Sequence, residues 1–410
     1  MPEIKRTAIT DKYRKRKPDT EVNKYYLTVS KRYMRAKFVT IILLVVFFAF
    51  MLFRFNDDIT YSNLMYLLRD FDTDPKTSEL VFEKIEYDEQ ENMNFTIYKG
   101  ELAIMGNRTL KMYNSRGAQT RSYESEFSDP VLIGSDKYLL SYGIGSPSYS
   151  LYTSIARVKS GEAPGDIECA DINNRGEYLF VCRSKDTKYV ICTYDSSFRP
   201  IAQYYKTRYV TSSAIGDDGR VIVVSFDSDG GAYNCEIELY YDGSEKPDSV
   251  YKTVGVFPLK CGVWKNGNYY VVCSDRILFF DDKGGLISTA QSSGEYTSYC
   301  ESDTGIAASY ANDSLGGSST VLLYDTKGNV NYSTKLNGSV TSIDVSDNKI
   351  YALAGSDVHM ISVNDGIDLE TNVNGGGASL LSYGDSCVIC YKRGAEGLVF
   401  GNSTTSETSD

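Results

Sequence analysis

A recurring phrase constrains the fold of this chain more than any other sequence feature. The segment ILFFDDKGGLIS begins at Ile277, and the related VLLYDTKGNVNYS begins 44 residues later at Val321. Each copy runs from an apolar stretch through an aromatic residue and an Asp-x-x-Gly turn into a more polar stretch. Asp at the first position and Gly at the fourth are typical of a type I turn between two strands. The phrase therefore predicts a repeated β-hairpin.

The hairpin recurs at a nearly constant spacing. Further copies are YNSRG from Tyr113, RVKSGE from Arg157, YDSSF from Tyr194, YDGSE from Tyr241 and VNDG from Val363. Each copy is marked by its glycine, which is Gly161 in the second copy, and Ser197 stands in for the glycine of the third copy. Six steps from Gly117 to Gly366 then cover 249 residues, or 41.5 residues per repeat. Such a period indicates a repeat architecture.

A second series of turns lies between the first, as in NNRG from Asn173, DDG from Asp217 and KNGN from Lys265. Two hairpin turns per repeat give four strands, which is one propeller blade. Apolar runs such as YLFVC suit strands covered on both faces, whereas NVNYSTKLN alternates like an outer edge strand, with Val330, Tyr332, Thr334 and Leu336 on one face.

The predicted fold is an all-β propeller of eight blades, with seven as the alternative. Seven complete sets of four strands lie between residues 95 and 376, and only three strands follow them. The segment VFEKIEYDE, residues 81–89, has no partner of its own. Pairing it with the C-terminal strands would close the ring and remove both free edges.

The N-terminal region predicts a membrane anchor. Residues 1–37 hold twelve Lys or Arg against four Asp or Glu, and residues 38–53 (FVTIILLVVFFAFMLF) carry no charge. Sixteen residues span about 24 Å as a helix, and Phe55 extends the run. No small-residue cleavage site follows it, so we expect an uncleaved anchor over 38–55 rather than a signal peptide. The positive-inside rule places the basic tail in the cytoplasm and the rest outside.

The expected domains follow from these segments. They are a basic cytoplasmic tail (1–37), a transmembrane anchor (38–55), a short juxtamembrane helix and linker (56–79), the propeller (80–402) and a polar tail (403–410). Outside the basic tail the chain holds 31 Lys or Arg against 50 Asp or Glu. An acidic body argues against nucleic-acid binding, which needs a basic surface.

The anchor and the Tyr/Phe-Asp-x-x-Gly turns resemble those of quinoprotein-like and YVTN-like β-propellers, and of bacterial single-pass propeller proteins of unassigned function. The resemblance covers residues 38 to about 402 and implies fold more than activity. WD40 propellers repeat Gly-His and Trp-Asp pairs, and quinone-dependent dehydrogenases carry a tryptophan in most blades. This chain has one His and one Trp, Trp264, which argues against an active quinoprotein. The outer-membrane assembly scaffold, an eight-bladed lipoprotein propeller, is the nearer functional analogy.

Most catalytic and metal-binding patterns are missing from the sequence. His359 is the single histidine, and Cys387 and Cys390 lie three apart in an expected strand, where they would face opposite sides. Disulfides Cys182–Cys192 and Cys261–Cys273 are open alternatives outside the cell. A calcium loop from Asp227 to Glu238 would have Ala232 where glycine is required. We predict no catalytic residue, cofactor or metal.

Tyrosine is the unusual component, with 34 residues. On expected loops, Tyr149, Tyr152, Tyr204 and Tyr205 are candidate contacts for a ligand or partner; packing between blades is the alternative for these side chains.

The predicted function is that of an extracytoplasmic binding or scaffold module, anchored in the bilayer through residues 38–55. Its partner would be a protein or a cell-wall polymer. The alternative is a cell-wall glycan lyase or hydrolase that uses carboxylates at the channel mouth, and a third reading is a sensor that signals through the anchor.

Overall fold

The computed structural model describes residues 21–54, 84–241, 243–313, 316–373, 377, 379–398 and 400. They belong to two compact units, an N-terminal helix and a β-domain. The predicted juxtamembrane helix and linker, 56–79, and the polar tail, 403–410, lie outside the described residues.

Helix α1 (Glu21–Arg54) contains the uncharged run found in the sequence. Its segment Thr28–Phe50 is long and apolar enough to cross a membrane. The helix begins 17 residues before residue 38, where the anchor is expected to start, and thus inside the basic tail. Part of that tail is therefore helical. The bounds of the anchor itself stay a prediction.

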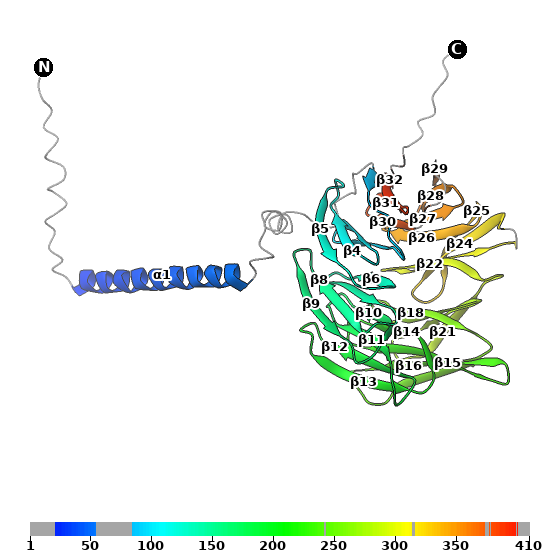
Figure 1. Cartoon of the computed structure of the whole chain (residues 1–410), viewed down its shortest axis with the longest axis horizontal. Helices are drawn as coiled ribbons and strands as arrows, with labels where there is room; N and C mark the ends of the chain where they lie inside the picture. Colours follow the sequence, from blue (N-terminus) through cyan, green and yellow to red (C-terminus); the bar gives the residue numbers. More distant parts are fainter. Residues whose placement is uncertain are drawn as a thin grey trace, which may run out of the picture. The chain divides into compact units, whose positions relative to one another are not determined.

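The β-domain consists of eight four-stranded antiparallel sheets arranged as propeller blades (Figure 1). Blades 1 to 4, each from its inner to its outer strand, are β2 (Asn94–Tyr98), β3 (Glu101–Met105), β4 (Thr109–Tyr113), β5 (Gln119–Glu124); β6 (Pro130–Gly134), β7 (Leu139–Gly143), β8 (Ser148–Tyr152), β9 (Arg157–Glu162); β10 (Ile167–Ile172), β11 (Tyr178–Arg183), β12 (Tyr189–Tyr194), β13 (Pro200–Lys206); and β14 (Tyr209–Ile215), β15 (Val221–Asp229), β16 (Ala232–Tyr240), β17 (Ser249–Val254).

Blades 5 to 8 follow in the same order. They are β18 (Pro258–Val263), β19 (Tyr269–Cys273), β20 (Arg276–Phe280), β21 (Leu286–Gln291); β22 (Tyr296–Ser302), β23 (Gly305–Ala311), β24 (Ser318–Asp325), β25 (Val330–Asn337); β26 (Val340–Ser346), β27 (Lys349–Ala354), β28 (Asp357–Ser362), β29 (Asp368–Asn372); and β30 (Ser379–Tyr383), β31 (Ser386–Cys390), β32 (Gly394–Leu398) with β1 (Lys84–Glu86).

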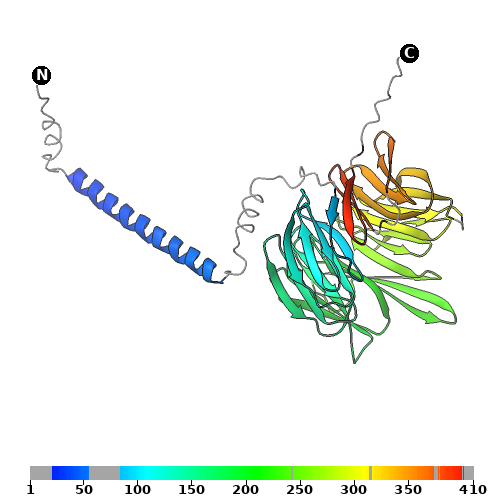
Figure 2. The same cartoon turned by 45° about the horizontal axis from the view of Figure 1, so that its top comes forward.

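Strand β1 closes the ring. It pairs antiparallel with β32 through Lys84↔Glu396, Ile85↔Ala395 and Glu86↔Gly394, and in Figure 2 the blue β1 lies beside the red C-terminal strands. The Tyr87 hydroxyl extends the closure, since it donates to the Gly394 carbonyl at 2.6 Å. The eight-blade prediction and its closure are confirmed, and the seven-blade alternative is wrong.

The core lies between blades. One cluster of buried side chains fills each of the eight blade interfaces, including the interface between blades 8 and 1. Second and third strands such as β11 and β20 are buried along nearly their whole length, while outer strands such as β17 alternate. In β25, Tyr332, Thr334 and Leu336 turn inward as predicted, but Val330 is exposed.

The Asp-x-x-Gly turns form as their residues require. Asp325 Oδ1 accepts hydrogen bonds from the backbone N–H groups of Lys327 and Asn329, and Gly328 has φ of 84°, a conformation that favours glycine. Two of the assigned markers were wrong. In the third copy the residue at the glycine position is Phe198, with φ of 67°, and not Ser197. Gly161 lies within β9 rather than in a turn.

Candidate functional site at the channel mouth

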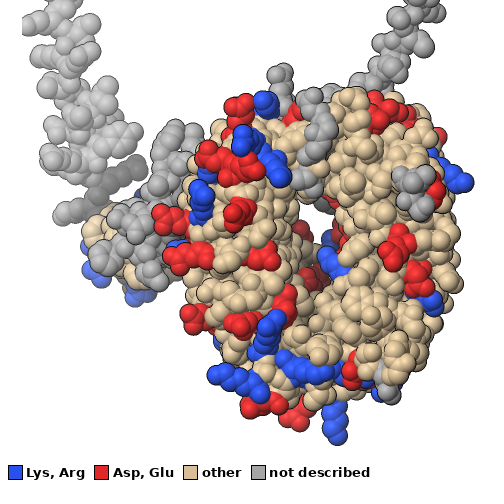
Figure 3. Space-filling view, turned by 45° about the vertical axis from the view of Figure 1, so that its right-hand side comes forward, with Lys and Arg blue, Asp and Glu red and all other residues tan. Residues whose placement is uncertain are grey.

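The inner strands enclose a channel that is open through the β-domain, and both cationic and anionic side chains lie on its wall (Figure 3). A cavity of about 390 Å³ lies at one end of the inner strands. The residues that line it include the last residues of β10, β14 and β18, which are Ile172, Ile215 and Val263. We call this cavity the channel mouth. It draws on blades 2 to 6, so that segments far apart in sequence converge there.

Two carboxyl groups and one lysine dominate the chemistry of the channel mouth. Asp171 on β10 accepts a hydrogen bond from the Ile215 N–H at 2.9 Å, and Glu301 on β22 accepts one from the Tyr270 hydroxyl at 2.8 Å. Lys260 on β18 is exposed to the channel, and its charge acts on both carboxylates. No ion pair forms at Lys260 within the described part of the chain. Its ammonium is therefore available to a ligand.

The enclosure by protein makes both acids weaker than usual. Burial raises the pKa of Asp171 to about 6, against the backbone hydrogen bond and the Lys260 charge, which lower it. Burial raises the pKa of Glu301 to about 7; the Tyr270 hydroxyl and Lys260 oppose the rise, and the Asp171 charge adds to it. Glu301 reaches channel water, so its carboxylate is enclosed rather than sealed off. Both carboxyls consequently titrate near neutral pH.

A thiol and a third carboxyl lie further along the channel wall. Cys300 donates to Asp344 Oδ1 at 2.9 Å, and the Ser382 N–H donates to Asp344 Oδ2 at 2.6 Å. Burial raises the pKa of both Cys300 and Asp344. The thiol therefore stays protonated, and this pair lacks the thiolate that a cysteine nucleophile needs.

Hydrogen bonds between turns join neighbouring blades around the channel mouth. The Asp136 N–H donates to Asn174 Oδ1 at 3.1 Å, and the Asn174 N–H donates to Asp217 Oδ1 at 2.9 Å. Lys265 Nζ lies 3.1 Å from Asp303 Oδ1. These bonds connect blade 2 to 3, 3 to 4 and 5 to 6. The rim of the mouth is thus a cross-linked polar surface.

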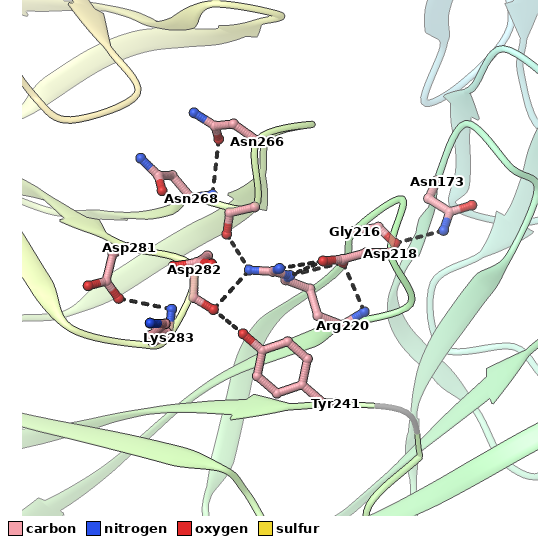
Figure 4. Close-up of polar contacts among 11 residues, drawn as sticks. Asn173, Gly216, Asp218, Arg220, Tyr241, Asn266, Asn268, Asp281, Asp282 and Lys283 are labelled. Atoms are coloured by element: carbon pink, nitrogen blue, oxygen red, sulfur yellow. Dashed lines mark hydrogen bonds and ion pairs between the residues drawn. The ribbon is translucent and has the colours of Figure 1, made fainter.

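Arg220 makes the most extensive of these connections (Figure 4). The side chain is 6% exposed and binds the Asp218 carboxylate in its own turn. Its Nη1 donates to the Gly267 and Asp282 carbonyls of blade 5, at 2.5 and 3.0 Å. The Tyr241 hydroxyl donates to the same Asp282 carbonyl. One buried guanidinium therefore fixes turns of blades 4 and 5 against each other.

A larger hollow of about 930 Å³ lies at the outer rim, where β1 meets blade 1. Its charges already pair with one another, as in Lys84 with Glu86 and Lys111 with Asp88. The channel mouth is the better candidate site, because its Asp171, Glu301 and Lys260 make no ion pair within the described part of the chain.

Three of the four tyrosines proposed as partner contacts are buried. Tyr149, Tyr152 and Tyr204 are 5%, 2% and 4% exposed, and they pack between blades; Tyr149, for example, lies 4.6 Å from the Phe180 ring. They lie in strands β8 and β13 rather than in loops, so they cannot contact a partner directly. Tyr205, on the outward face of β13, is 59% exposed, and its contact with a partner stays a prediction.

The cysteines and His359 occupy structural positions. All nine cysteines are free, so neither Cys182–Cys192 nor Cys261–Cys273 forms a disulfide. Cys387 and Cys390 face different blade interfaces, as their spacing predicted. His359 is buried, with Nδ1 3.1 Å from an Asp368 oxygen on the next strand. Among the described residues, no group of three His, Cys, Asp or Glu could hold a metal.

Sequence reasoning named channel-mouth carboxylates as a class but did not identify Asp171, Glu301 or Lys260. A signal is present: each is a charged residue in an inner strand, within five residues of a second-series turn, as in ECADINN and PLKCGVW. Which of these strands face one another across a ring cannot be read from local spacing.

Comparison with known proteins places the chain among β-propellers. The crystal structure of BamB from Moraxella catarrhalis has a TM-score of 0.50 at 13% identity, covering 77% of this chain and 97% of that one. At this identity the likeness shows the fold alone.

Two further structures match with lower scores. BBS1N in complex with ARL6DN has a TM-score of 0.43 at 10% identity, covering 79% of this chain and 95% of that one. The Mitotic Checkpoint Complex has a TM-score of 0.45 at 12% identity, covering 77% of this chain and 87% of that one. A search of curated proteins finds no match. The family model described as a family of unknown function, DUF5711, matches residues 73–392, and the chain therefore belongs to this family.

Proposed function

We propose that this protein is a membrane-anchored, extracytoplasmic binding module whose propeller docks a protein or cell-wall partner at the channel mouth. Helix α1 supports the anchor, because its segment Thr28–Phe50 can span a membrane. The basic residues before that segment support a cytoplasmic N-terminus by the positive-inside rule. The recurring turns support a place among quinoprotein-like and YVTN-like propellers.

The observation that carries the proposal is the unequal charge of a fixed, concave polar surface. The channel mouth is lined by four acidic side chains, Asp171, Asp217, Glu301 and Asp303, against the two cations Lys260 and Lys265. All four carry charge once the pH exceeds the raised pKa values of Asp171 and Glu301. Concave sites with converging polar groups are the usual binding positions on a fold. The excess of carboxylates favours a basic partner surface, through complementary potential and a faster encounter.

Affinity capture tests this proposal. Tagged full-length protein is recovered from solubilised membranes, as wild type and as the double variant Asp171→Asn/Glu301→Gln. Proteins that the wild type retains at low salt should be released by salt and reduced several-fold in the double variant. The control Glu162→Gln/Glu370→Gln likewise replaces two acidic side chains by amides, on the exposed outer strands β9 and β29. Equal recovery with both double variants would contradict the proposal.

A second candidate function rests on the two weakened acids. Glycoside hydrolysis uses a pair of carboxyls, one protonated and one ionised, and Asp171 and Glu301 titrate in the range where both forms coexist. The test is incubation with purified peptidoglycan and wall polysaccharides, followed by mass spectrometry. Release of fragments by the wild type and not by Glu301→Gln would replace the binding function by this one.

A further inference from the structure

Helix α1 is longer than a membrane span requires. Its 34 residues extend for about 51 Å, against roughly 30 Å for the hydrocarbon layer. The uncharged run begins at Phe38, so residues 21–37 continue the same helix for about 25 Å on its N-terminal side. This extension needs an explanation other than crossing the bilayer.

One face of α1 carries no charge along both parts of the helix. Alternating steps of three and four residues define this face, which we call the α1 seam: Tyr26, Val29, Tyr33, Ala36, Thr40, Leu43, Phe47 and Phe50. The four cations closest to the apolar run, Lys31, Arg32, Arg35 and Lys37, all lie off the seam. A 3.5-residue repeat is the spacing by which two helices wind around each other in a left-handed coiled coil.

We propose that the α1 seam pairs with the α1 seam of a second copy of this chain, in parallel, to form a dimer. Tyr26 lies outside the segment Thr28–Phe50, and Val29 and Tyr33 lie in its first two turns beside Lys31, Arg32 and Arg35. Head groups and water, rather than lipid tails, surround a helix where cations are this dense. Tyr26, Val29 and Tyr33 are nevertheless 65%, 42% and 73% exposed in the single helix. A second helix in the same phase covers the seam on both sides of the membrane boundary.

The area of the seam suffices for such a contact. Its four aromatic residues, Tyr26, Tyr33, Phe47 and Phe50, are between 57% and 73% exposed. A fully covered aromatic side chain buries about 150–250 Å², so at these exposures the four offer about 400–600 Å² on each helix. The pair could then bury about 800–1,300 Å², a range around the roughly 1,000 Å² expected of a specific interface.

The middle of the seam permits a close approach of the two helices. Ala36 and Thr40 are its smallest residues, and Thr40 Oγ1 donates to the Ala36 carbonyl at 3.0 Å within the same helix. The hydroxyl is therefore satisfied and needs no partner across the pair. Small residues at this point let two backbones approach, as membrane helix pairs commonly do.

The flanking charges make a specific prediction about salt. In a parallel pair, Arg32 of one helix and Lys37 of the other lie at the two sides of the seam, where like charges repel. Pairing should therefore strengthen when salt or anionic lipid screens these cations. A contact held together by charge attraction would weaken under the same conditions.

Cysteine scanning of the full-length protein in proteoliposomes tests the seam. Single cysteines replace Tyr26, Val29 and Tyr33 on the seam and, as matched controls, Lys31 and Arg35 off it. The natural cysteines lie in the propeller, where seven are buried and two half-buried, and the parent protein measures their background. Disulfide-linked dimer should form at least fivefold more at the seam positions. Equal yields at all five positions, or a maximum at 31 and 35, would overturn the proposal.

A charge placed on the seam provides the second readout. Tyr33→Lys should weaken dimerisation, measured by energy transfer between labelled copies on dilution with lipid, by at least tenfold. The control Met34→Lys adds the same charge one position off the seam and should leave it within about twofold. Transfer that stays absent in the wild type at every dilution would show that something other than a second copy covers this face.

Discussion

At the scale of single residues, this propeller depends on a few side chains that bridge blades. Trp264 is buried and donates from Nε1 to the Ser302 and Gly305 carbonyls, at 3.1 and 3.2 Å, so it fastens blade 5 to blade 6. Asn173 does the same between blades 3 and 4, through the Gly216 carbonyl at 2.8 Å. The sequence showed that tryptophan docking was missing from most repeats, but it did not show which polar residues take its place.

The raised pKa of Glu301 predicts how the stability of the protein depends on pH. The Glu301 pKa of about 7 in the folded protein lies above the ordinary value of 4.5, so between these values the folded state binds more protons than the unfolded state. Stability should therefore fall as the pH rises from about 5 to 8. Thermal melts across this range should show a smaller loss for Glu301→Gln than for the wild type.

The matched control for this measurement is Glu295→Gln, which changes an exposed carboxylate just before the same strand. Its loss of thermal stability between about pH 5 and 8 should equal that of the wild type. If Glu301→Gln shows the same loss as the wild type, the enclosure of the Glu301 carboxyl has no effect on stability.

At the scale of elements, the turn pattern predicted strands better than it predicted boundaries. Four strands per repeat, buried middle strands and the alternating outer face of β25 all followed from local chemistry. Failures occurred at a single turn residue and at the start of the helix. Phe198 adopts a glycine-like φ because Asp195 Oδ1 accepts from two N–H groups of its turn, and the basic tail of α1 is helical although its composition indicated only charge.

Strand β1 provides the test of closure at this scale. Ile85 is 3% exposed and packs between blades 8 and 1, so Ile85→Ala should lower the free energy of unfolding by about 2–5 kcal/mol. Ile201→Ala makes the same change on the outer strand β13, where the side chain is 49% exposed, and should cost much less. Urea unfolding of the two variants measures the difference. Similar losses for both would mean that β1 does not complete the ring.

At the scale of the whole molecule, the sequence predicted the architecture but not the residues of the candidate site. Blade number and closure could be predicted because a repeat period and a partnerless strand are properties of the chain order. The channel mouth could not be, because Asp171 and Glu301 are 130 residues apart and line one cavity only in the folded propeller. The candidate tyrosines were misplaced for a related reason, since a strand residue and a loop residue carry the same local signal.

Photo-crosslinking in intact cells tests the central claim, that the channel mouth docks an extracytoplasmic partner, most directly. A photoreactive amino acid replaces Asn174 or Lys265 at the mouth and, as a control, Val254 on the exposed outer strand β17. We expect the mouth positions, and not position 254, to trap the same partner, and the Asp171→Asn/Glu301→Gln background to reduce its yield. Crosslinks to cytoplasmic proteins, or a partner trapped at position 254 as well as at the mouth, would contradict the account.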